Sequence, residues 1–271
     1  MSVSDTQLHI AGGSPAARYE TLTVLSIILL VLTLGWSLVD PRMIDGVPVW
    51  MKPLKFSLSF VVVFATLALV ERFMSDRFRG GRTMRLVGLA MAAAYLAEMA
   101  YIFYMAARGE HSHFNLTTPF HETIYALMGV GAVTLISGIA VIGWLAHRDT
   151  GAAFGPGLRE GLWLGCLSTF VLTLLVAGYL SSSGGHFVGV HPEGGAVIPL
   201  VGWSGVAGDL RPAHFASMHA MQILPLLGLW LDRRDTRNAV GMVRLVAIGY
   251  CAATLLVFVQ ALLGLPLVSL G

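Results

Sequence analysis

The chain has 271 residues, of which 56% are hydrophobic and only 12% are charged, and its formal net charge is +2. An ordinary soluble domain is about 45–50% apolar and about 25% charged, so this chain has too few polar residues to cover its apolar ones. The composition excludes an ordinary soluble domain and predicts a protein embedded in lipid. Arginines at membrane edges explain the small positive charge, and no nucleic-acid partner is expected.

Seven apolar segments follow one another, each long enough to cross a bilayer core about 30 Å thick, which takes about 20 residues. They are residues 21–39, 54–71, 84–107, 122–146, 161–182, 212–231 and 242–265. Backbone groups in lipid must be paired within a helix or a closed barrel, and the alternating pattern of barrel strands does not occur. The expected fold class is therefore all-α, a polytopic membrane protein with a bundle of seven transmembrane helices.

The arginines predict the orientation, because short cytoplasmic loops carry the excess of lysine and arginine. Together with Arg18, the loops 72–85, 147–160 and 232–244 hold 12 basic residues, and the opposite side holds five. The N-terminus is therefore expected in the cytoplasm and the C-terminus outside. The expected parts are a cytoplasmic segment at 1–20, one transmembrane domain at 21–265 that includes an outer loop at 183–211, and an outer tail at 266–271.

The second segment starts with W-M-K-P-L-K-F, which contains the only lysines of the chain, Lys52 and Lys55. Both stand on the predicted outer side, against the orientation rule. They suggest an anionic ligand, a haem propionate, or a carboxylate partner such as Glu98 or Glu122. The alternative is that the two lysines extend to the lipid headgroups beside Trp50.

Glu98 lies in the third segment, about ten residues from its outer end near Arg108. At a rise of 1.5 Å per residue this is roughly 15 Å deep. An ionisable side chain at that depth costs at least about 2.5–3.5 kcal/mol on insertion scales and is a functional candidate. Glu98 is expected to be neutral, paired, or facing a hydrated cavity, and the alternative without function is a protonated side chain hydrogen-bonded between helices. Tyr101 also lies in the outer half of this segment.

The fourth and sixth segments begin alike, with T-P-F-H-E and R-P-A-H-F, which place His121 and His214 two residues after a proline. Two histidines on neighbouring helices suit a metal ion or the axial positions of a haem, with Glu98 and Glu122 as candidate carboxylate ligands. His219, roughly 10 Å deep, is the third candidate histidine. It lies about 140° around the helix from His214, so both face one small ion only if the helix start is irregular. The alternative is an ordinary helix start with proline in the first turn.

Further polar residues gather on the predicted outer side and are candidates for binding a small ligand. With the two lysines they are Tyr101, His111, His113, His186, His191, Arg211 and Gln260. The outer loop with His186 and His191 is rich in glycine and also carries apolar residues. It is expected either to fold back as a lid or to be loosely ordered.

The runs W-M-K-P-L-K-F-S-L-S, S-H-F-N-L-T-T-P-F and G-D-L-R-P-A-H-F resemble those of a family of bacterial multi-pass inner-membrane proteins, and the likeness covers most of the chain. The resemblance implies the fold, the bacterial inner membrane, and an outer position for all three runs, and it transfers no chemistry. Microbial rhodopsins are excluded because the last segment has no lysine for a retinal Schiff base. Membrane zinc hydrolases of the progestin-receptor and ceramidase type are excluded because their paired H-x-x-x-H is missing.

Three functions remain open. The favoured one is an outward-facing histidine and glutamate site for haem b or a transition metal such as zinc or copper, in redox chemistry or metal handling. The second is a metal-free small-ligand binding protein or proton-coupled transporter that uses the same cavity. The third is an accessory subunit or sensor whose outer loops dock a partner. The sequence assigns no catalytic residue and no oligomeric state; a serine hydrolase is disfavoured because no G-x-S-x-G occurs.

Overall fold

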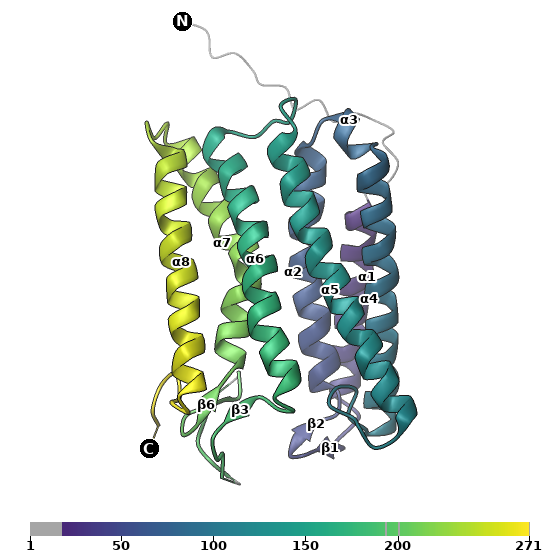
Figure 1. The fold of residues 1–271 in the computed structure, drawn as a ribbon. Helices are drawn as coiled ribbons and strands as arrows, with labels where there is room; N and C mark the ends of the chain where they lie inside the picture. Colours follow the sequence, from purple (N-terminus) through teal and green to yellow (C-terminus); the bar gives the residue numbers. More distant parts are fainter. Residues whose placement is uncertain (1–17, 193, 200, 271) are drawn as a thin grey trace, which may run out of the picture.

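The structure is a computed structural model that describes residues 18–192, 194–199 and 201–270. Most of the expected cytoplasmic segment 1–20 and the last residue of the expected tail therefore lie outside the described residues. Within them, seven helices of 20 residues or more run side by side and reverse direction from one to the next (Figure 1). They are α1 (Arg18–Ser37), α2 (Met51–Phe73), α4 (Arg82–Arg108), α5 (Pro119–Arg148), α6 (Pro156–Ser182), α7 (Arg211–Arg233) and α8 (Ala239–Leu262), and the single-turn helix α3 (Asp76–Arg79) lies between α2 and α4.

Six of the long helices are long and apolar enough to cross a membrane, and α7 is the exception. The first half of α7 carries two histidines, a serine and a glutamine, which lower its hydropathy. Large apolar side chains are exposed on the other helices, among them Leu32 at 60%, Val130 at 64% and Leu256 at 70%. Apolar faces of this kind are suited to lipid rather than to water. The helices thus indicate an integral membrane protein, and a crossing by α7 stays a prediction.

Local signals set the helix ends. Thr118 precedes Pro119, and its side-chain oxygen accepts a hydrogen bond from the backbone N–H of His121 at 3.2 Å, so α5 begins with a cap and a first-turn proline. α4 ends at Arg108, and its C-cap residue Gly109 has a φ of 73°, in the left-handed region that favours glycine. In the seven long helices, the predicted segment starts one to five residues after the observed first residue. The reason is that an apolar run does not include the polar residues of the first helical turn.

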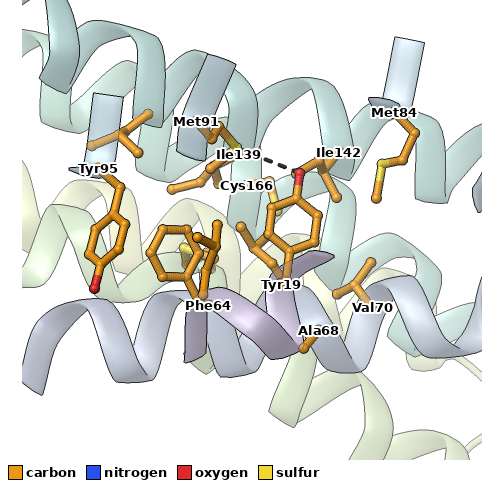
Figure 2. Packing of buried hydrophobic residues seen from close by; sticks show 14 of the residues in the cluster. Tyr19, Phe64, Ala68, Val70, Met84, Met91, Tyr95, Ile139, Ile142 and Cys166 are labelled. Carbon is orange, nitrogen blue, oxygen red and sulfur yellow. Dashed lines mark hydrogen bonds between the residues drawn. The ribbon is translucent and has the colours of Figure 1, made fainter. Parts of the chain in front are cut away.

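Helices α1, α2, α4 and α5 share the main buried core. Figure 2 shows Tyr19 of α1 and Phe64 of α2 beside Met91 and Tyr95 of α4. The hydroxyl of Tyr19 donates to the sulfur of Met91 at 3.8 Å, and the rings of Phe64 and Tyr95 meet edge to face with centroids 4.9 Å apart. This packing fixes α2 against α4 and so sets the level at which their polar side chains meet.

Helix α7 lies against α6 along glycines, and we call this contact the α6–α7 seam. A Cβ added at Gly161 would lie 2.4 Å from the backbone oxygen of Leu224, and one added at Gly228 would lie 2.1 Å from the backbone oxygen of Gly157. The two backbones therefore touch, which is a contact that small residues allow between membrane helices. The seam holds the least apolar long helix inside the bundle.

The two ends of the bundle differ in structure. One end, the β end, carries three antiparallel pairs: β1 (Met43–Ile44) with β2 (Val47–Pro48), β3 (Phe187–Val188) with β6 (Gly208–Asp209), and β4 (Val197–Ile198) with β5 (Trp203–Ser204). Figure 1 shows β1, β2, β3 and β6 at this end, together with the C-terminus. The opposite end, the basic end, carries the arginine-rich turns and α3. The loop 183–211 is folded into two small sheets over the β end.

Candidate functional site

Charged and aromatic side chains from five parts of the chain meet at the β end. Lys52 and Lys55 lie in the first turns of α2, Arg211 begins α7, and His113 and His186 come from the two loops that join α4 to α5 and α6 to α7. With Glu98 of α4 they form what we call the outer cluster, whose six members are linked by the electrostatic interactions described below. All six were candidates in the sequence.

Lys52 and Glu98 interact electrostatically. Glu98 is only 5% exposed, whereas Lys52 is partly exposed and its ammonium lies 6.0 Å from the centre of the Phe56 ring. A carboxylate buried among helices is costly unless a cation or a hydrogen-bond donor accompanies it. The lysine of the predicted outer side therefore supplies the charge partner of the buried acid.

Two buried oxygens at this level have no hydrogen-bond partner within the described residues, Oε1 of Glu98 and Oγ of Ser57. The rings of Phe60 on α2 and Tyr95 on α4 lie 4.8 Å apart. The helices α2 and α4 are antiparallel. Ser57 lies three residues from Phe60 toward the β end, and Glu98 lies three residues from Tyr95 in the same direction. The two unpaired oxygens therefore lie at the same depth in the bundle. Buried polar atoms are rarely left unpaired, and such a pair is a site where a proton, water or ligand is needed.

Gly131 of α5 makes room for the buried carboxyl group. A Cβ added at Gly131 would lie 2.9 Å from Oε1 of Glu98. Any larger residue would therefore push the carboxyl group away. Glu98 thus lies beside Gly131 of α5, and its charge partner Lys52 belongs to α2.

His186 lies at the centre of the outer cluster. It interacts electrostatically with Lys52, Lys55, Arg211 and Asp209, and burial, followed by the charge of Arg211, lowers the pKa of its imidazole. Its Nδ1 is buried and has no partner within the described residues. At neutral pH this ring is an uncharged hydrogen-bonding group with three cationic neighbours, Lys52, Lys55 and Arg211.

His113 lies beside His186 and is also kept neutral. Burial, and then the charge of Lys52, lower the pKa of His113 to about 3. Its ring centroid lies 5.7 Å from that of Phe56 and 6.0 Å from that of Tyr125. The two histidines therefore add polar atoms to the outer cluster without adding charge.

Arg211 and Lys55 carry the remaining charges. Arg211 donates to Asp209 at 2.6 Å and to the backbone oxygen of Gly202 at 2.6 Å, and Asp209 is completely paired because it also accepts from Ser204 N–H at 2.8 Å. These bonds, against the effect of burial, hold the pKa of Asp209 below its usual value. Within the described residues, Lys55 donates to the backbone oxygen of Val201 at 3.4 Å, and its charged neighbour is Arg211.

The charges of the outer cluster do not balance. Glu98 offsets Lys52 and Asp209 offsets Arg211, which leaves Lys55 without a carboxylate partner among the described residues. Because both histidines are neutral, the outer cluster has an excess positive charge next to an unpaired imidazole nitrogen. Such an arrangement is complementary to a small anion.

The candidate metal ligands are dispersed. His121 pairs with Tyr101, with the ring Nδ1 2.9 Å from the phenol oxygen, and its other nitrogen lies 3.9 Å from Glu110. His219 packs on Phe215 with ring centroids 4.1 Å apart. In the part of the chain that the structure describes, no three His, Cys, Asp or Glu side chains come together to hold a metal ion.

The other candidates make local contacts. Glu122 is exposed, while Nδ1 of His214 is buried and unpaired among the described residues. His111 contacts Asp45 at 3.0 Å, and Gln260 donates to the backbone oxygen of Pro266 at 2.6 Å. His191 stacks on Phe187, and its Nδ1 lies 2.9 Å from Oγ of Ser204, so it supports the loop that covers Arg211.

Sequence reasoning did not select Ser57, Gly131 or Phe114, whose ring lies 5.7 Å from His186. Ser57 and Phe114 stand in the two specific runs that begin with tryptophan and with S-H-F-N, and a search of these runs for polar or aromatic residues would have found both. The sequence around Gly131 carries no such signal, because this glycine matters only through its close approach to Glu98 of α4.

No family model, curated protein or solved structure matches the chain.

Proposed function

We propose that the protein is a seven-helix integral membrane protein that binds a small anionic ligand at the outer cluster, with the β end outside the bacterial inner membrane and the N-terminus in the cytoplasm. The arginines at the basic end support this orientation through the positive-inside rule. The proposal commits to the second function of the sequence analysis, a metal-free ligand-binding protein or proton-coupled transporter.

One observation carries the proposal: the buried Glu98 relies on Lys52 for charge compensation and keeps an oxygen without a partner among the described residues, while Lys55, one helical turn from Lys52 on α2, has no carboxylate partner there. An anion that enters the outer cluster competes with Glu98 for Lys52. Once Lys52 pairs with the anion, a buried glutamate without a partner is stabilised in its neutral form. Anion binding is therefore expected to be accompanied by uptake of a proton on Glu98.

The test is a thermal-shift titration of the detergent-purified protein with small mono- and dicarboxylates and with inorganic phosphate. Neutral amide analogues of the same size serve as ligand controls. The anions are expected to raise the melting temperature, and Lys55→Gln is expected to weaken binding at least tenfold, whereas Arg42→Gln is not, since Arg42 is a β-end cation already paired with Asp40 at 2.7 Å.

The proton link has its own measurement. The wild type is expected to bind the anion more tightly as pH falls. The affinity of Glu98→Gln is expected to depend little on pH, because a glutamine at position 98 stays neutral. Equal stabilisation by amides and acids, or unchanged binding by Lys55→Gln, would contradict the proposal.

A metal or haem site stays the second candidate, on one observation. Nδ1 of His214 and Nδ1 of His186 are buried without a partner in the described residues, and such nitrogens suit metal ligation. Neither ring belongs to a three-ligand group, so a metal would need ligands from a second molecule or from solvent. Metal analysis and a visible spectrum of purified protein test this candidate, with a Soret band as the sign of haem.

A further inference from the structure

The basic end holds a cavity of about 190 Å³ where α3, the start of α4 and the end of α5 meet. Three polar residues, Arg77, Arg82 and Thr83, and three apolar ones, Phe78, Met84 and Leu145, line it. It lies at the opposite end of the bundle from the outer cluster and plays no part in the proposed function.

The two arginines of the cavity are free to bind an anion. Their neighbour Arg79 is paired with Asp76, whereas Arg77 and Arg82 form no ion pair within the described residues. The guanidinium of Arg77 lies 6.0 Å from the centre of the Phe78 ring, a contact that leaves its N–H groups available. Two free guanidinium groups on one cavity favour a phosphate, which arginine binds with two parallel hydrogen bonds.

The backbone adds to the positive potential. Helix α4 begins at Arg82, and its N-cap residue Gly81, which also lines the cavity, has no side chain to cap the first N–H groups. Free N–H groups and the helix dipole at this end favour an anion. Thr83, in the first turn, adds a hydroxyl group.

The position and the apolar wall identify the kind of anion. Leu145 lies one turn before the end of α5 and Met84 one turn inside α4, so the cavity sits where two candidate membrane helices end. Basic pockets between helices at this level bind the headgroups of acidic lipids, whose glycerol and first acyl carbons require apolar neighbours. We propose that this cavity binds the phosphate-bearing headgroup of an anionic phospholipid.

The experiment measures the melting temperature of the full chain in detergent with added phosphatidylglycerol, phosphatidylcholine or inorganic phosphate. Phosphatidylglycerol is expected to stabilise the wild type. For the double variant Arg77→Gln/Arg82→Gln, the phosphatidylglycerol concentration that gives half of the maximal rise in melting temperature is expected to increase at least tenfold. Both arginines are exposed, so the fold is expected to survive.

Two control variants separate the cavity from general charge. Arg233→Gln/Arg237→Gln removes the same charge from exposed positions at the same end and is expected to respond like the wild type. Thr83→Trp keeps the charge but fills the cavity and is expected to weaken the lipid effect. The proposal would be overturned if both double variants lost the stabilisation by phosphatidylglycerol equally, or if Thr83→Trp were stabilised as much as the wild type. It would also be overturned if phosphatidylcholine or inorganic phosphate alone raised the melting temperature as much as phosphatidylglycerol does.

Discussion

The α6–α7 seam and the outer cluster both bring α7 against other parts of the chain, but they treat polar groups in opposite ways. In the seam two polar contacts are paired: Thr169 accepts from the backbone N–H of Met221 at 3.0 Å, and the hydroxyls of Thr173 and Ser217 are 3.1 Å apart. In the outer cluster, buried polar atoms of Glu98 and His186 remain unpaired among the described residues.

This difference in pairing suggests that the seam has a structural role and that the outer cluster has a functional one. A fully paired polar contact stabilises a fold, whereas an unpaired buried group costs free energy and persists where something else requires it. The seam is therefore expected to determine stability, and the outer cluster is expected to determine ligand and pH responses. Three variants test this division, in order of decreasing effect.

Gly161→Ala tests the seam most strongly. The added methyl group would lie 2.4 Å from the backbone oxygen of Leu224, which cannot move without separating α6 from α7. We expect a loss of about 2–3 kcal/mol in the free energy of unfolding. Thermal or denaturant unfolding in detergent measures it, with Gly249→Ala of α8 as the control, because no atom lies within 4 Å of its added Cβ. Equal stability of both variants would show that the seam is not tightly packed.

His113→Gln tests the pH response of the outer cluster. The folded protein holds the pKa of His113 at about 3, against an ordinary value near 6.5, so between these values the unfolded chain binds a proton that the folded one does not. The folded state is therefore destabilised as pH falls below 6.5. We expect the wild type to lose about 1–2 kcal/mol more than His113→Gln between pH 7 and pH 5. Parallel unfolding curves at the two pH values would contradict this expectation.

Glu122→Gln is expected to have the smallest effect. The side chain is exposed and forms no ion pair within the described residues, so stability should change by less than about 0.5 kcal/mol. Its metal content, measured by elemental analysis, is expected to equal that of the wild type. A drop in bound metal would instead revive Glu122 as a ligand.

The helices and the members of the outer cluster could be predicted from the sequence for one reason. Lipid imposes a simple pattern, so apolar length locates helices, and a charge such as Glu98 or Lys55 in the wrong place is conspicuous. The helix predicted at 122–146 corresponds to α5, and of the several partners suggested for Lys52, Glu98 is the one that interacts with it electrostatically.

Which residues meet could not be predicted in the same way. The parallel starts of the fourth and sixth segments suggested that His121 and His214 form a pair, but the rotation of each helix is set by its packing. His121 is oriented by Tyr101 of the adjacent α4, and α7 is oriented by the glycines of α6, a partner that its own sequence does not reveal.

The glycines of α6 also bear on how the protein is made. A helix such as α7, with polar residues through its first half, gains little free energy if it moves by itself from the translocation channel into lipid. Gly157, Gly161 and Gly165 offer it a surface of protein backbone instead, and α8 covers another side. During synthesis, α6 is therefore expected to wait at the channel until α7 and α8 have emerged, so that the three helices enter the bilayer together.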